Sequence, residues 1–144
     1  MATERSASVV WQGDLMNGSG TIADAPSGAF GPLDVSWASR AEEPNGRTSP
    51  EELLASAWAS CFAMALSGGL ARGGNPPEKL EASATVTFQP GEGITKGVLT
   101  VRGTVPGMDE GAFKDAADGA KDNCPVSKAL AGIPDVTVEA SLAA

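Results

Sequence analysis

The sequence predicts an α+β protein that folds as a single domain of 144 residues. Segments that alternate apolar and polar residues, typical of half-buried strands, occur on both sides of segments with helical spacing. Glycine and proline separate these segments, and no internal repeat or low-complexity linker is present. A chain of this length, with 42% hydrophobic residues, suits one compact core and leaves no room for a second.

The N-terminal part of the chain predicts an antiparallel meander. Residues 8–12, 20–23 and 34–40 are short segments, rich in β-branched or aromatic residues and bounded by Gly, Asn and Pro. MNGSG is predicted as the first turn of the meander. The last of these strands, DVSWASR, ends at Arg40.

A long apolar helix follows, and its start is clearly marked. Ser49 is predicted as the N-cap, with Pro50 at the first helical position and Glu52 closing a capping box. Residues 53–71 carry no charge, and this uncharged segment is formally long enough to enter a bilayer. Their Ala, Ser and Gly content, and their place between strands that need a sheet, favour a buried helix and no membrane. In a domain this small, a second copy covers such a helix most easily, so we expect a homodimer.

The rest of the chain predicts a hairpin, two helices and a last strand. Residues 81–88 and 94–105 alternate as strands and flank the loop QPGEG. Residues 109–121 and 125–130 have helical spacing, and residues 136–142 repeat the strand pattern.

Composition excludes several classes of function. With 10 basic against 18 acidic residues and a pI near 4.4, the surface repels phosphate backbones and anionic lipid, so nucleic acid is not an expected partner. The chain has no histidine, which excludes histidine triads and histidine-ligated metals, and we expect no metal and no cofactor. Two cysteines do not make a disulfide framework, and MATERSASVV has no signal-peptide pattern, so we expect a cytoplasmic protein with reduced thiols.

The two cysteines have different surroundings. Cys61 lies in the middle of the apolar helix with no evident acid, base or metal partner, and a small packed hydrophobe is its simplest interpretation. Cys124 precedes Pro125 and is predicted as a helix N-cap, where free N–H groups and the helix dipole favour a thiolate. Local physical chemistry therefore predicts that Cys124 is the more acidic thiol.

The segments TSPEELLASAWASCFAMALS and NCPVSKAL, with WQGDLMNGSGTI near the start, resemble the family of osmotically inducible protein C and the organic hydroperoxide resistance proteins. The resemblance covers nearly the whole chain. It implies antiparallel sheets packed around a long central helix in an intertwined homodimer. It also implies a thiol peroxidase that reduces organic hydroperoxides and is regenerated by a dithiol.

The same resemblance implies the site residues. Cys61 would be the peroxidatic cysteine and Cys124 the resolving one, while Glu51 matches the family's active-site glutamate. Arg40 matches the arginine as placed in the osmotically inducible branch. The hydroperoxide resistance branch carries its arginine near the first hairpin, where DLMNGSGTIAD has none, so we favour the osmotically inducible branch. The loop AEEPNGR is one residue longer than expected, which leaves Arg47 as a rival.

These residue types suit peroxide chemistry. A guanidinium near Cys61 would stabilise its thiolate and hold the peroxide oxygens, and Glu51 would orient that guanidinium through a bidentate pair. Trp58, Phe62 and Met64 would suit a bulky organic substrate, although each is equally well explained as core. Glu51 and Cys61 are ten residues apart on one helix, roughly 15 Å, so we expect each site to combine two chains.

Two other functions stay open. The chain could be a non-catalytic dimeric module whose cysteines are structural. It could also be a disulfide oxidoreductase acting on protein thiols, although such enzymes normally carry a C-x-x-C pair, and this sequence has none.

Overall fold

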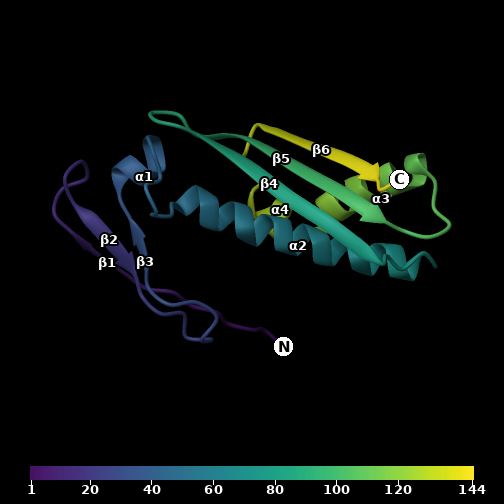
Figure 1. The fold of residues 1–144 in the computed structure, drawn as a ribbon, viewed down its shortest axis with the longest axis horizontal. Coiled ribbons are helices and arrows are strands. Elements are labelled where there is room, and N and C mark those ends of the chain that lie inside the picture. Colours follow the sequence, from purple (N-terminus) through teal and green to yellow (C-terminus); the bar gives the residue numbers. More distant parts are fainter. The chain divides into compact units, whose positions relative to one another are not determined.

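The computed structural model describes all 144 residues, in two compact units, residues 1–53 and 54–144. The α+β class is confirmed, while the single domain stays a prediction. The elements follow one another along the chain as shown in Figure 1. They are β1 (Val9–Gln12), β2 (Ser19–Ile22), β3 (Leu33–Val35), α1 (Trp37–Ala41), α2 (Pro50–Arg72), β4 (Lys79–Gln89), β5 (Gly93–Thr104), α3 (Glu110–Asn123), α4 (Pro125–Ala129) and β6 (Asp135–Leu142).

The first unit contains the predicted meander. β1, β2 and β3 form an antiparallel sheet in that order, in which Trp11 pairs with Gly20. The turn between β1 and β2 is held by Asp14, whose carboxylate accepts the Asn17 N–H at 2.8 Å and whose carbonyl accepts the Gly18 N–H at 2.9 Å. The turn therefore spans residues 14–18, and the prediction of a turn at MNGSG is confirmed for residues 16–18 only, because Ser19 and Gly20 already belong to β2.

Residues 34–40 are not one strand, and here the prediction was wrong. β3 ends at Val35, and Ser36 caps the short helix α1. The Ser36 hydroxyl accepts the Ser39 N–H, and the Ser39 hydroxyl accepts the Ser36 N–H, each at 3.0 Å. This reciprocal capping box stabilises a helical turn at a point where the apolar pattern alone indicates a strand. Arg40 consequently lies on a helix.

Helix α2 begins as predicted. The Glu52 N–H donates to the Ser49 hydroxyl at 3.1 Å, and the Glu52 carboxylate accepts the Thr48 hydroxyl at 2.6 Å. Within the second unit, every fourth residue of α2 is buried in the core, namely Trp58, Phe62, Leu66 and Leu70. The other faces are more open, with Met64 73% exposed. By length and composition α2 could cross a membrane, but one such helix is weak evidence, and its buried stripe is that of a core helix.

The second unit contains a mixed sheet in the order β4-β5-β6. β4 and β5 form the predicted antiparallel hairpin, whereas β6 pairs with β5 in parallel. The expected antiparallel arrangement is therefore corrected for β6. The reason lies in the connection: α3 and α4 separate β5 from β6 and return the chain to the end of the sheet where β5 began, which makes the new strand parallel.

Glycines of β5 let two aromatic side chains approach the sheet closely. A Cβ atom at Gly97 would overlap the indole ring of Trp58, and one at Gly103 would lie 2.6 Å from the Phe113 ring. Between them, Leu99 and Val101 are fully buried in the same core. The sequence spacing of glycine and aliphatic residues on β5 thus fixes where α2 and α3 can pack.

Candidate active site

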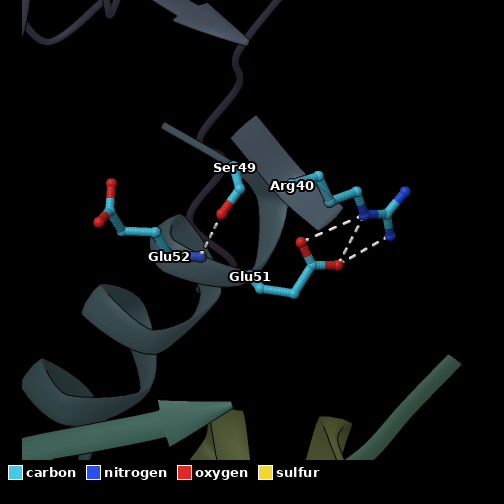
Figure 2. A network of polar contacts seen from close by, with 4 residues as sticks. All are labelled: Arg40, Ser49, Glu51 and Glu52. Atoms are coloured by element: carbon cyan, nitrogen blue, oxygen red, sulfur yellow. Dashed lines mark hydrogen bonds and ion pairs between the residues drawn. The ribbon is translucent and has the colours of Figure 1, made fainter. Parts of the chain in front are cut away.

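An arginine and a glutamate form a charged pair in the first unit (Figure 2). Nε of Arg40 lies 2.9 Å from Oε1 and 3.2 Å from Oε2 of Glu51, and Nη2 lies 2.8 Å from Oε1. The Arg40 side chain keeps 33% of its surface exposed, and that of Glu51 only 9%. A buried carboxylate that holds a partly exposed guanidinium fixes the direction of its remaining N–H donors.

The structure distinguishes Arg40 from its rival, Arg47. The capping box of α1 presents Arg40 to Glu51, which is the second residue of α2. Arg47 is exposed and lies in a turn, where its N–H donates to the carbonyl of Pro44 at 3.0 Å. Of the two candidates, Arg40 is the partner of Glu51.

Arg40 also borders an apolar cleft within the first unit. The cleft has a volume of about 370 Å³, and most of the residues that line it are hydrophobic. They include Trp11 from β1, Val35 from β3 and Trp37 from α1. The guanidinium therefore adjoins a surface suited to an apolar group.

Cys61 and Cys124 come together in the second unit. Both thiols are free, and the two side chains lie close enough for each to shift the pKa of the other. Cys61 lies on α2 and is partly exposed, whereas Cys124 is fully buried at the N-cap of α4. The crossover from β5 to β6 brings Cys124 to α2, so two cysteines far apart in the sequence lie close together.

The surroundings shift the two thiols in opposite directions. Burial and the hydrogen bond with Cys124 raise the pKa of Cys61. For Cys124, burial acts to raise the pKa, but the nearby donor groups of Cys61, Ser127 and Val126 outweigh it, so the pKa is lowered. The Cys124 side chain makes no capping hydrogen bond to α4, so these groups act through their proximity to the sulfur. This agrees with the expectation that Cys124 is the more acidic thiol.

Trp58 and Ser127 make a contact that the sequence analysis missed. The indole Nε1 of Trp58 donates to the Ser127 hydroxyl at 2.7 Å, and Trp58 is only 1% exposed. Of the apolar residues near Cys61, Trp58 and Phe62 are core, while Met64 is exposed. The signal for Ser127 was available, because it is the third residue of a helix whose N-cap is Cys124.

The predicted site residues thus form two pairs. The structure brings Arg40 to Glu51 in the first unit and Cys61 to Cys124 in the second. No group of three or more His, Cys, Asp and Glu side chains that could hold a metal ion is present.

Known proteins define the class of this chain. Residues 43–139 match the family described as OsmC-like protein. The chain is 35% identical over 133 residues to "Peroxiredoxin OsmC" of Escherichia coli (strain K12), covering 90% of this chain and 92% of the relative. It is 34% identical over 95 residues to "Organic hydroperoxide resistance protein" of Xanthomonas axonopodis pv. citri (strain 306), covering 63% of this chain and 65% of the relative. The longer match is with the osmotically inducible branch, as the sequence predicts.

Solved structures agree on the fold. The OsmC-like protein from Mycoplasma pneumoniae superimposes with a TM-score of 0.74 over 100% of both chains at 18% identity. OhrB of Bacillus subtilis does so with a TM-score of 0.65 over 96% of this chain and 98% of its own, at 24% identity. This chain belongs to the OsmC-like family.

Proposed function

We propose that this protein is a cytoplasmic, homodimeric thiol peroxidase that reduces organic hydroperoxides to alcohols and is regenerated by a dithiol. The observation that carries the proposal is the pair of neighbouring free thiols, Cys61 on α2 and Cys124 at the N-cap of α4. Two relatives that are identical to this chain at about a third of the aligned residues are named for peroxide chemistry, which supports the same class of reaction.

In the first step, the Cys61 thiolate attacks the distal oxygen of the hydroperoxide. The O–O bond breaks, the alkoxide takes up a proton and leaves as the alcohol, and Cys61 becomes a sulfenic acid. In the second step, the Cys124 thiolate attacks the Cys61 sulfur, and hydroxide leaves as water after protonation. The resulting disulfide accepts two electrons from an external dithiol, which returns both thiols.

Cys61 needs help to ionise, because its surroundings raise its pKa. A guanidinium beside the sulfur supplies that help, since a positive charge favours the thiolate. Arg40 is the proposed cation: Glu51 fixes its orientation, and it adjoins an apolar cleft that suits the organic part of the substrate. In the proposed site, the guanidinium of Arg40 would also hold the peroxide oxygens and the leaving alkoxide.

Helix geometry favours a site shared by two chains. Glu51 and Cys61 lie on the continuous helix α2, ten residues apart, which separates their backbones by roughly 15 Å and turns them to different faces. We therefore propose two composite sites per dimer. Each would take Cys61 and Cys124 from one chain, and Arg40 with Glu51 from the other.

Single-turnover chemistry tests the proposal. After one equivalent of cumene hydroperoxide, the parent protein is expected to lose two thiols and form one intramolecular disulfide. Cys124→Ser should complete one turnover and stop as a sulfenic acid, and Cys61→Ser should not react. Unchanged thiols in the parent would point instead to a non-catalytic module. A protein that reacts with disulfides of other proteins but not with hydroperoxide would be an oxidoreductase.

A further inference from the structure

We propose that Trp58 and Ser127 are positioning residues for Cys124: the indole N–H fixes the Ser127 hydroxyl so that its proton is donated to the Cys124 sulfur. We call the three residues Trp58, Ser127 and Cys124 the relay. Its role in disulfide closure rests on the proposed peroxidase function. The hydrogen bond between Trp58 and Ser127 does not rest on that function, because it is present in the reduced protein.

The Trp58 side chain is held rigidly at one end of the relay. It is 1% exposed, and Nε1 lies 2.7 Å from the Ser127 hydroxyl oxygen. Its ring packs over Gly97 of β5, where any Cβ atom would overlap the indole. The tryptophan therefore has little freedom to turn its N–H away from Ser127.

Ser127 is placed by the helix that Cys124 caps. It is the third residue of α4, and a polar side chain at that position reaches back toward the N-cap residue. A hydroxyl group has one proton to donate and can accept two hydrogen bonds. Because the indole N–H can only donate, it occupies an acceptor site of Ser127 and leaves the hydroxyl proton for another acceptor. The Cys124 side chain, whose pKa the nearby Ser127 lowers, is the acceptor we assign to it.

The consequence is a prepared nucleophile for the second step. A thiolate attacks a sulfenic acid, whereas a thiol does so poorly, and a fully buried sulfur without donors would keep its proton. A hydroxyl proton directed at the Cys124 sulfur would stabilise its thiolate relative to its thiol. Trp58 thus acts on Cys124 through Ser127, without contact with the hydroperoxide.

The first test needs no substrate. In reduced protein labelled with 13C at the cysteine Cβ, the Cys124 signal reports ionisation of that thiol alone. Ser127→Ala is expected to move its titration to higher pH, and Trp58→Phe to move it in the same direction by less. Ser127→Thr should restore the parent titration, and Ser83→Ala, which removes an exposed hydroxyl on β4, should change nothing.

A double variant separates the relay from simple packing. If Trp58 acts through Ser127, replacing Trp58 by Phe in the Ser127→Ala background should cause no additional shift. A full additional shift, or an unchanged Cys124 titration in Ser127→Ala, would overturn the proposal. Ser127→Ala removes one oxygen and leaves the aromatic core intact, so it keeps the test valid if Trp58→Phe folds poorly.

Rapid kinetics then tests the role in closure. With cumene hydroperoxide at pH 7, Ser127→Ala is expected to form the sulfenic acid at the parent rate but close the disulfide about tenfold more slowly, the effect of one lost hydrogen bond to a charged group. Closure at the parent rate would contradict the role in catalysis. Absence of any reaction in the parent protein would instead contradict the peroxidase function and leave the titration result standing.

Discussion

The guanidinium of Arg40 binds the carboxylate of Glu51 through two nitrogens. Nε lies 2.9 Å and Nη2 lies 2.8 Å from the same oxygen, Oε1. This side-on contact fixes the guanidinium through both Nε and Nη2. Lysine cannot reproduce this arrangement, because its ammonium group is a point charge without a planar fork.

The first prediction is that Arg40→Lys lowers kcat/KM for cumene hydroperoxide by about a hundredfold, the usual loss when one oriented donor to a developing oxyanion is removed. Arg47→Lys is the matched control, because Arg47 is exposed in a turn and should retain parent activity. Steady-state consumption of the hydroperoxide with a dithiol measures both variants. Loss of activity in Arg47→Lys alone would reverse the assignment.

The second prediction concerns the origin of the two pairs. Cys61→Ser and Glu51→Ala should each be inactive as homodimers. After subunit exchange, half the dimers are mixed, and each mixed dimer has one intact site if the pairs come from different chains. Activity should then recover to roughly a quarter of the parent value. Mixed dimers, demonstrated by native mass spectrometry, that stay inactive would show that both pairs come from one chain.

The third prediction is a pH dependence of stability in the reduced protein. The folded state lowers the pKa of Cys124 from its ordinary value of 9.0, so between the folded pKa and 9 the unfolded chain binds more protons. The free energy of unfolding should therefore gain a contribution as pH rises through this window, and lose it as pH falls through the folded pKa. The pKa of Cys61 is raised above 9.0, so this thiol lowers the free energy of unfolding with rising pH, but only above pH 9.

Urea unfolding of the parent and of Cys124→Ala at several pH values measures this contribution. The difference in unfolding free energy between the two proteins should widen toward pH 9. In Cys61→Ala, where Cys124 keeps its serine and amide donors but loses one thiol donor, the gain should be smaller than in the parent. Parallel curves for the parent and Cys124→Ala would contradict the lowered pKa.

The fourth prediction compares two glycines. Gly97→Ala should destabilise the protein by about 1–3 kcal/mol, because the added methyl group meets the Trp58 ring inside a packed core. Gly119→Ala is the matched control: it lies within α3 with nothing near its Cβ position, so alanine should stabilise by about 0.5–1 kcal/mol. Chemical unfolding measures both, and a stable Gly97→Ala protein would refute the close approach of the indole.

Much of the fold could be predicted because its signals are local. Ser49 and Pro50 mark the start of α2, and Pro125 marks that of α4, through capping preferences that need no knowledge of the rest of the chain. The α1 helix was missed because the box formed by Ser36 and Ser39 uses serine at both positions, whereas the usual pattern ends in Glu or Gln.

The parallel pairing of β6 and the contact of Ser127 with Trp58 could not be predicted in the same way. Alternation of apolar residues gives the faces of a strand but not its direction relative to a neighbour. Ser127 gains its partner only when the fold brings it to Trp58, 69 positions earlier in the chain. The pairing of Arg40 with Glu51 likewise needed coordinates to separate it from Arg47.

The crossover between β5 and β6 places Cys124 beside a residue 63 positions earlier in the chain. A disulfide between Cys61 and Cys124 would therefore close a loop of more than a third of the protein. Loops of this size restrict the unfolded chain by roughly 4 kcal/mol in polymer terms. The oxidised protein would accordingly resist proteases longer than the reduced one. Exposure to peroxide would therefore lengthen the lifetime of the protein until a dithiol reduced the disulfide.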